Sequence, residues 1–264
     1  MKHLGKVLIA AGALALSAMS HAVPVTNWAV TTTGVWSSFA PGGVTLSNAG
    51  HTLSWGTSTG SGQSSLVITN PVPAVQNVLT LFTGDPLDAA HIANSVTLTH
   101  NNNPITGTSL TNATLRVSVS LQPTNPAAGG FPLPNIDYDI KFVETPNQAP
   151  CAAPSPANNP CNDIFVQVAG LLNESFIYDG QTYFVNAFPT NGGVLSVLPT
   201  SACTAAGVGA GCIGFTTQEG QSTQLPFGLT ISTERLQVPE PGSLALIGLA
   251  LAGAGLISRR RRNT

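Results

Sequence analysis

Three acidic residues near the middle of the sequence have the residue type and spacing of a candidate glycosidase site. Asp137 and Asp139 share one face of an expected strand with Lys141, and Glu144 follows. Glycoside hydrolases place two carboxyl groups on either side of the bond they cleave. Carboxylates two residues apart also occur on any solvated strand face, and no second acid can be placed across a cleft from the sequence. We therefore expect solvated side chains, with a secreted hydrolase as an alternative.

The densest polar cluster is Thr99-His100-Asn101-Asn102, which stands where an expected strand runs into Pro104. Asn side chains hydrogen-bond their own backbone in turns, and a His after a strand can donate to a loop carbonyl. We expect these four residues to form a structural motif. Contact with a ligand is the alternative.

Other motifs for metal or nucleotide binding are weak. Asp85, Asp88 and His91 could touch a cation, but three ligands without further carboxylates make a poor calcium or zinc site, so solvated loop residues are expected. The glycines at 207–211 precede no helix that could receive a phosphate. We predict a protein without catalytic residues, metal ligands or cofactors.

The four cysteines fall into two close pairs, Cys151 with Cys161 and Cys203 with Cys212. Disulfides are the default in an exported chain. Each bridge would close a loop of about ten residues and chiefly pin a segment that lacks its own core. We expect pairing within each pair. A zinc site is the alternative, although these spacings exceed those of zinc knuckles.

Charge is scarce and negative between residues 23 and 238. Three basic residues, Arg116, Lys141 and Arg235, stand against ten acidic ones, which gives a net charge of −7. Such a surface repels phosphate backbones, so nucleic-acid binding is excluded. Solubility then depends on Ser, Thr, Asn and Gln, as in many extracellular β proteins.

Period-two alternation predicts the fold class. Leu115, Val117, Val119 and Leu121 alternate with polar residues, and the segment 136–142 repeats the pattern. Asp179-Gly180 predicts a tight hairpin turn between 174–178 and 181–188. Between residues 23 and 237, no segment shows the sustained spacing of apolar residues, three and four positions apart, that is typical of a helix. We predict an all-β, antiparallel two-sheet sandwich of the jelly-roll kind.

Tryptophans offer the second functional alternative, a carbohydrate-binding surface module. Trp28, Trp36 and Trp55 could stack on sugar rings if they were exposed, whereas burial in a core is the usual outcome. We expect burial and keep glycan binding open.

Both ends of the chain resemble targeting segments. Lys2 and Lys6 precede an apolar stretch and the small-x-small sequence Ser20-His21-Ala22, which predicts a signal peptide over residues 1–22, with a retained N-terminal anchor as the alternative. The exported domain is then 23–237. Residues 238–264 contain Pro239-Glu240-Pro241, an apolar run over 243–258 and four arginines, Arg259, Arg260, Arg261 and Arg262. Arginines stop transfer, so the body stays outside. A permanent single-pass anchor is the alternative.

This C-terminal arrangement resembles the PEP-CTERM protein-sorting signal, a tag that has also been labelled an ice-binding protein C-terminal segment. The resemblance implies recognition and cleavage near Pro239-Glu240-Pro241 by an exosortase, a membrane enzyme linked to exopolysaccharide and biofilm production. Secretion machinery, signal peptidase, the inner membrane and extracellular polysaccharide are the other implied partners.

The domain between the targeting segments is similar to the THxN family of PEP-CTERM proteins. The similarity is carried by Ser54-Trp55-Gly56, the segments 60–66 and 99–105, Phe142 to Asn147, and 214–217. It implies no activity. We expect a non-enzymatic envelope or matrix protein, transiently anchored in the membrane and then released to the cell surface or outside.

Overall fold

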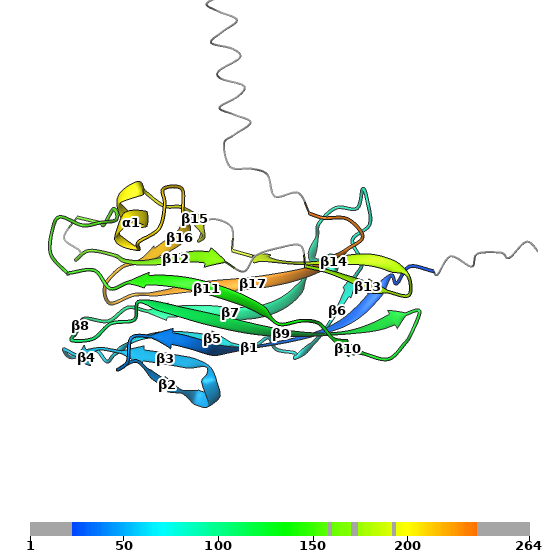
Figure 1. Cartoon of the computed structure of the whole chain (residues 1–264), viewed down its shortest axis with the longest axis horizontal. Helices are drawn as coiled ribbons and strands as arrows, with labels where there is room; N and C mark the ends of the chain where they lie inside the picture. Colours follow the sequence, from blue (N-terminus) through cyan, green and yellow to red (C-terminus); the bar gives the residue numbers. More distant parts are fainter. Residues whose placement is uncertain (1–22, 158–159, 170–173, 192–193, 237–264) are drawn as a thin grey trace, which may run out of the picture.

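The computed structural model describes residues 23–157, 160–169, 174–191 and 194–236. Their strands form two large sheets (Figure 1). The first sheet has the order β15 (Ser196–Val197), β16 (Ile213–Thr217), β12 (Asp163–Ala169), β11 (Ile136–Val143), β9 (Asn112–Asn125), β1 (Asn27–Ala40) and β6 (Val75–Leu79), and β10 (Phe131–Pro132) pairs with β9.

The second sheet has the order β13 (Glu174–Tyr178), β14 (Gln181–Pro189), β17 (Ser222–Ser232), β7 (Ala93–Asn101), β5 (Ser64–Thr69), β3 (Thr52–Trp55) and β2 (Thr45–Ser47). A small ribbon pairs β4 (Thr57–Ser58) with β8 (Ile105–Thr106). Named strands pair antiparallel throughout, which confirms the all-β, antiparallel prediction. The jelly-roll connectivity stays a prediction.

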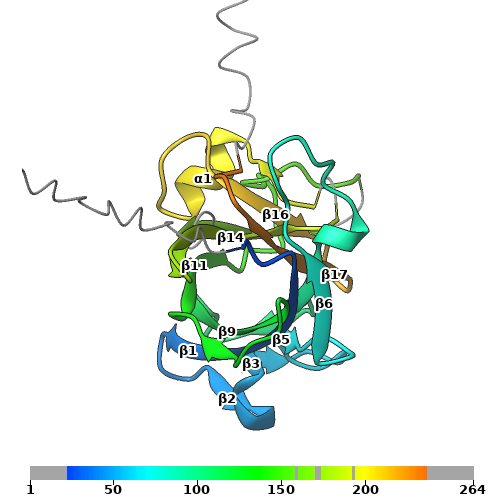
Figure 2. The ribbon, with the colours of Figure 1, turned by 90° about the vertical axis from the view of Figure 1, so that its right-hand side faces the viewer.

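The two sheets curl around a common interior, as the end-on view in Figure 2 shows. The predicted inward residues of β9, from Leu115 to Leu121, are at most 2% exposed at every second position. Sheet packing is tight at Gly34, where a Cβ atom would lie 2.8 Å from Val96 Cγ1 of the opposite sheet. Alternation along strands such as β9 and β1 therefore separates the main apolar core from a polar outer face.

The predicted hairpin joins β13 to β14. Asp179 has φ 48° and Gly180 has φ 75°, which are the positive values that a two-residue turn of this type needs. Tyr178 pairs with Gln181 across the turn. The turn is confirmed, because only residues such as Asp and Gly accept this backbone at low cost.

A second, smaller core covers the outer side of β12. Helix α1 (Thr200–Ala205), a short exception to the expectation that no helix would form, buries Ala202 and Cys203 there against Ile164 and Val166. Two 3-10 turns, η1 (Asn48–Gly50) and η2 (Ala89–His91), complete the described elements.

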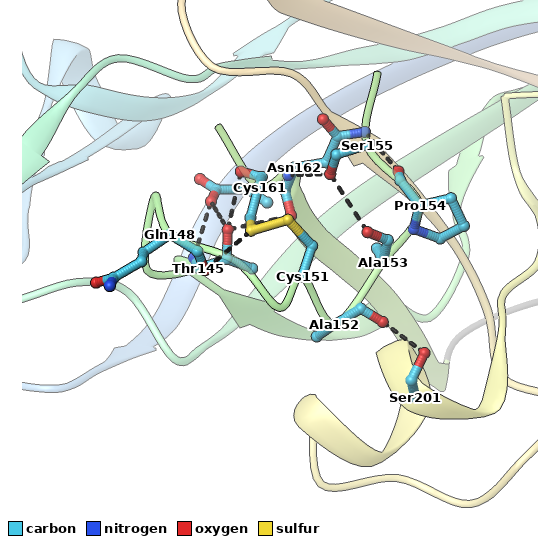
Figure 3. Close-up of a disulfide and its surroundings, with 11 residues drawn as sticks. Thr145, Gln148, Cys151, Ala152, Ala153, Pro154, Ser155, Cys161, Asn162 and Ser201 are labelled. Carbon is cyan, nitrogen blue, oxygen red and sulfur yellow. Dashed lines mark hydrogen bonds between the residues drawn. A yellow bond between two sulfur atoms is a disulfide. The ribbon is translucent and has the colours of Figure 1, made fainter. Parts of the chain in front are cut away.

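The disulfides hold this second core together. Cys151 is bonded to Cys161 and Cys203 to Cys212, in the predicted pairing. Figure 3 shows the first bridge, with the Ser201 hydroxyl of α1 donating to the carbonyl of Ala152 at 2.6 Å. This hydrogen bond joins the loop of the first disulfide to helix α1, which carries Cys203 of the second disulfide.

The targeting segments fall outside the described residues. This applies to the predicted signal peptide, the Pro-Glu-Pro motif, the apolar run and the arginine cluster. Within the part of the chain that the structure describes, no helix has the length and apolar character needed to cross a membrane.

Candidate functional site: a buried carboxyl cluster at one end of the sheets

The Thr99-His100-Asn101-Asn102 segment lies at the end of β7, between β5 and β17. Strand alternation turns His100 into the core, and Asn102, just past the strand, is also buried; each is 1% exposed. Thr99 and Asn101 are half-buried on the other face. The motif therefore presents different side chains to the interior and to the outer surface.

The asparagines connect neighbouring strands. The Nδ2 group of Asn101 donates to Ser65 Oγ on β5 at 3.1 Å, and Ser222 Oγ on β17 donates to Asn101 Oδ1 at 2.7 Å. Asn102 Nδ2 donates to the carbonyl of Thr217 at 3.0 Å, and its backbone N–H donates to the carbonyl of Gln221 at 2.9 Å. These bonds fix the β16–β17 turn against the end of β7, as a structural role requires.

His100 packs among aromatic rings rather than in a turn. Its imidazole stacks on Trp55, with centroids 6.0 Å apart and planes 13° apart, and meets Phe142 edge-on at 4.9 Å. Burial lowers the pKa of His100 to about 3, so the ring is neutral near pH 7. Its Nε2 atom has no hydrogen-bond partner among the described residues and lies 4.0 Å from Asp163 Oδ2.

Three carboxyl groups interact with one another here, and one of them, Asp163, faces the histidine. Glu144 follows β11, Asp163 begins β12, and Glu219 lies in the β16–β17 turn. Adjacent antiparallel strands bring these strand ends to the same edge of the first sheet. Trp55 Nε1 of the second sheet donates to Glu144 Oε2 at 2.9 Å, so the cluster also links the two sheets.

Burial and mutual repulsion change the protonation of the cluster. Burial, and then the nearby charge of Glu144, raises the pKa of Asp163 to about 9. Burial also raises the pKa of Glu144 to about 7, with a further contribution from Glu219 and opposition from the Trp55 hydrogen bond. Near neutral pH the pair therefore retains a proton that exposed carboxyl groups would have released.

Asp163 also connects the cluster to the first disulfide. The backbone N–H of Thr145 donates to Asp163 Oδ1 at 2.9 Å, and Thr145 Oγ1 donates to the carbonyl of Cys161 at 2.9 Å. Figure 3 shows Thr145 beside the bridge. Asp163 and the disulfide loop therefore share Thr145 as a hydrogen-bond partner.

The carboxyl cluster can retain a proton near neutral pH, but Asp163 is too deeply buried in this structure to contact a substrate. Asp163 is 1% exposed, and its Oδ2 atom faces the interior near His100. Glycoside hydrolysis requires both carboxyl groups to flank the bond that is cleaved. In this structure Asp163 is not exposed to such a bond.

Two of the three acids singled out in the sequence, Asp137 and Asp139, lie elsewhere, whereas Glu144 belongs to the cluster. The Arg116 guanidinium donates two hydrogen bonds of 2.8 Å to the carboxylate of Asp137. Thr114 Oγ1 donates to Asp139 Oδ1 at 2.8 Å. Arg116 lowers the pKa of Asp137, so that carboxyl group stays charged. The structure places both aspartates on the outer face of β11, on the opposite face from Asp163.

Asp85, Asp88 and His91 do meet, at the N-cap of the 3-10 turn η2. His91 Nδ1 lies 2.8 Å from Asp88 Oδ1 and His91 Nε2 lies 3.9 Å from Asp85 Oδ2, while the N–H of Ala90 donates to Asp88. These partners satisfy the groups locally. Over the described residues, no group of three or more His, Cys, Asp or Glu side chains is arranged to hold a metal ion.

The tryptophans are all buried. Trp28 and Trp55 are 0% exposed and Trp36 is 4% exposed. Trp28 lies in an aromatic cluster in which Tyr183 and Tyr178 meet it edge-on at 5.3 and 5.7 Å. None of the three presents a ring face for sugar stacking, as the expected burial requires.

Sequence reasoning named Glu144 and His100 but missed Asp163 and Glu219. Asp163 begins the apolar strand β12 and Glu219 lies in the turn after β16, and these positions were the available signal. To predict the cluster, one must also know that β16, β12 and β11 are neighbours in the sheet. Alternation along single strands does not reveal this order.

Comparison with known families finds a match at the C-terminus. The model of the PEP-CTERM protein-sorting motif matches residues 237–262, which include the Pro-Glu-Pro motif, the apolar run and the arginine cluster. The predicted sorting signal is thereby confirmed. No curated protein matches the chain. Because this match covers the C-terminal tail and not the folded domain, the similarity of the domain to the THxN family stays a prediction.

Proposed function

We propose that this chain acts at the cell surface as a non-enzymatic component of the extracellular polysaccharide matrix. The chain carries a PEP-CTERM sorting signal and is therefore exported to the cell surface through a transient membrane anchor. The sorting motif over residues 237–262 is the observation that carries the proposal. The exosortase is its processing partner.

The surface of the domain supports a matrix role. Charged residues make up 8% of the chain, and hydroxyl side chains line the outer face of the first sheet. Thr31 pairs with Ser120 and Thr33 with Ser118 in register across β1 and β9. Neutral hydroxyl groups hydrogen-bond to sugars without the charge that would bind nucleic acid or anionic lipid.

The buried carboxyl cluster supports a non-enzymatic role. Its hydrogen bonds and ring contacts join β3, β7, β11 and the first disulfide loop, and its most perturbed member, Asp163, is closed off from solvent. Perturbed carboxyl groups are common in active sites, but structural networks perturb them as well. Here the contacts favour a structural network.

Processing of the tail tests the proposal. In cells that lack the exosortase, the full chain is expected in the membrane fraction, whereas the wild-type strain releases a shorter form whose two ends mass spectrometry defines. Replacing Pro239 and Pro241 with Ala should have the same effect as the deletion. Release of a normally trimmed protein from the exosortase-deficient strain would contradict the proposal.

A carbohydrate-binding module is the second candidate, and the hydroxyl rows of β1 and β9 are the observation that favours it. The buried tryptophans cannot supply the contact, so binding would use the exposed Thr33 and its neighbours. Affinity gels containing the producer's own polysaccharide should retard the domain, and Thr33→Lys should weaken this retardation. Thr57→Lys, on the separate β4–β8 ribbon, is the matched control. Equal mobility with and without polysaccharide would remove this candidate.

A further inference from the structure

The domain has two distinct ends. β17 starts at Ser222, which pairs with Asn101 beside the carboxyl cluster, and ends at Ser232, which pairs with Phe184 of β14. The sorting tail follows β17, so it leaves from the end opposite the cluster. Figure 1 shows α1 and β8 near one end and the β13–β14 hairpin near the other.

The chain is fixed to the domain almost up to the sorting motif. Leu81 N–H donates to the carbonyl of Ile231 at 2.8 Å, and the N–H of Thr233 donates back to the carbonyl of Leu81 at 3.1 Å. Thr83 Oγ1 donates to Glu234 Oε1 at 2.5 Å, and the Arg235 guanidinium lies 5.3 Å from the ring centre of Phe184. We call loop 81–91 together with residues 232–236 the tether face.

Little chain separates this face from the residues that the exosortase recognises. Pro239 is the third residue and Glu240 the fourth after Leu236. Four fully extended residues reach only about 14 Å, which is less than the width of a folded enzyme domain. An active site that holds Glu240 must therefore lie against the domain unless the clamp at residues 231–234 opens.

We propose that the tether face is a docking surface for the exosortase, so that the folded domain, as well as its tail, is recognised during sorting. This inference rests on the proposed processing of the tail. It goes further by assigning a contact outside the sorting motif, on residues that follow β6 and end β17.

The face has the chemistry of a small docking site. A groove of about 160 Å³ lies between Leu81, Phe82 and the last described residues. Leu87 follows the lining residue Asp85 by two positions on the same loop, which also carries Asp88, and it is 47% exposed. The His91 contact lowers the pKa of Asp88, so that carboxyl group is charged at neutral pH. The complementary enzyme surface would offer an apolar patch bordered by basic groups.

A matched pair of leucine variants tests the contact in the full chain. Leu46 is 42% exposed, and its register through Leu53 and Leu66 places it level with His100 at the other end. In cells that contain the exosortase, Leu87→Asp should slow tail removal at least about fivefold, as expected for loss of an interface anchor. Leu46→Asp should be processed at the wild-type rate.

Two further measurements keep the result independent of folding. A photocrosslinking residue at position 87 should form an adduct with the exosortase, and the same residue at position 46 should not. Inserting about twenty Gly and Ser residues after Leu236 should remove the difference between the two variants, because the domain need no longer meet the enzyme.

Equal processing of the two aspartate variants, or no adduct from position 87, would overturn the docking proposal while leaving exosortase processing intact. Normal processing of the wild-type chain in a strain without the exosortase would instead overturn the proposed function, whatever the variants show.

Discussion

His100 and Asp163 face each other between the two sheets, with His100 Nε2 4.0 Å from Asp163 Oδ2 and both side chains at most 1% exposed. His100 belongs to β7 of the second sheet and Asp163 to β12 of the first. This distance is too long for a hydrogen bond. If both groups were charged, two charges would be buried without a hydrogen bond between them, whereas a neutral imidazole beside a protonated carboxyl group buries no charge. The protonation of Asp163 and the contact between the sheets are therefore coupled.

Stability should be greatest in mild acid. The folded pKa of Asp163 is raised to about 9 and that of Glu144 to about 7, so their contribution is complete below about pH 4 and is lost as the pH rises through 7 and 9. The depressed pKa of His100 acts in the opposite direction, lowering stability as the pH falls from about 6.5 to about 3. Because two carboxyl groups outweigh one imidazole, stability already falls above about pH 4, and we expect the highest Tm near that pH.

Thermal unfolding of the exported domain in buffers from pH 3 to pH 9 at constant ionic strength checks this profile. Each proton retained only by the folded state changes stability by about 1.4 kcal/mol per pH unit. A Tm that is flat or rises between pH 6 and pH 9 would exclude a buried protonated pair.

Asp163→Asn should remove much of the alkaline loss of stability. The amide keeps an oxygen for the Thr145 N–H and carries no charge when the pH rises. We expect a higher Tm than wild type at pH 8.5 and a shallower slope between pH 7 and 9. Asp137→Asn is the matched control. It breaks the half-exposed pair with Arg116, costs at most about 1 kcal/mol and leaves the slope unchanged. Identical slopes for both variants would assign the titration to other groups.

The faces of the strands were predictable because alternation is a local property. Leu115 and its period-two partners are buried, and the Asp179-Gly180 turn follows from two residues that tolerate positive φ. The pairing of Cys203 with Cys212 was likewise local. Asp163, however, comes next to Glu144 only through β11–β12 pairing, and Glu219 joins them through β12–β16 pairing, which brings together residues far apart in the sequence. Sequence patterns do not contain that pairing order.

Trp55→Phe should both weaken the domain and shift its titration. The change removes the indole N–H that donates to Glu144 and part of the ring stacked on His100. A buried acceptor without its donor costs about 1 to 3 kcal/mol. The Trp55 hydrogen bond lowers the pKa of Glu144, so its loss should raise that pKa further.

NMR titration of the Glu144 carboxyl carbon and urea unfolding measure the two effects of Trp55→Phe. Trp36→Phe is the control, because Trp36 is also buried but donates to the carbonyl of His51 rather than to a carboxyl group of the cluster. A Glu144 pKa that stays the same in Trp55→Phe would show that the indole does not govern this carboxyl group.

The two disulfides should stabilise the outer side of β12 rather than the main core. Each closes a loop of about ten residues, which corresponds to about 2 to 3 kcal/mol in the chain-entropy model. Replacing Cys203 and Cys212 with Ala should release α1 and speed amide exchange at Ile164 and Val166, whose side chains belong to the second core. Leu115 and Val117 of β9, in the main core, should keep wild-type protection. Uniformly faster exchange in β9 and β12 would show instead that the bridge supports the whole domain.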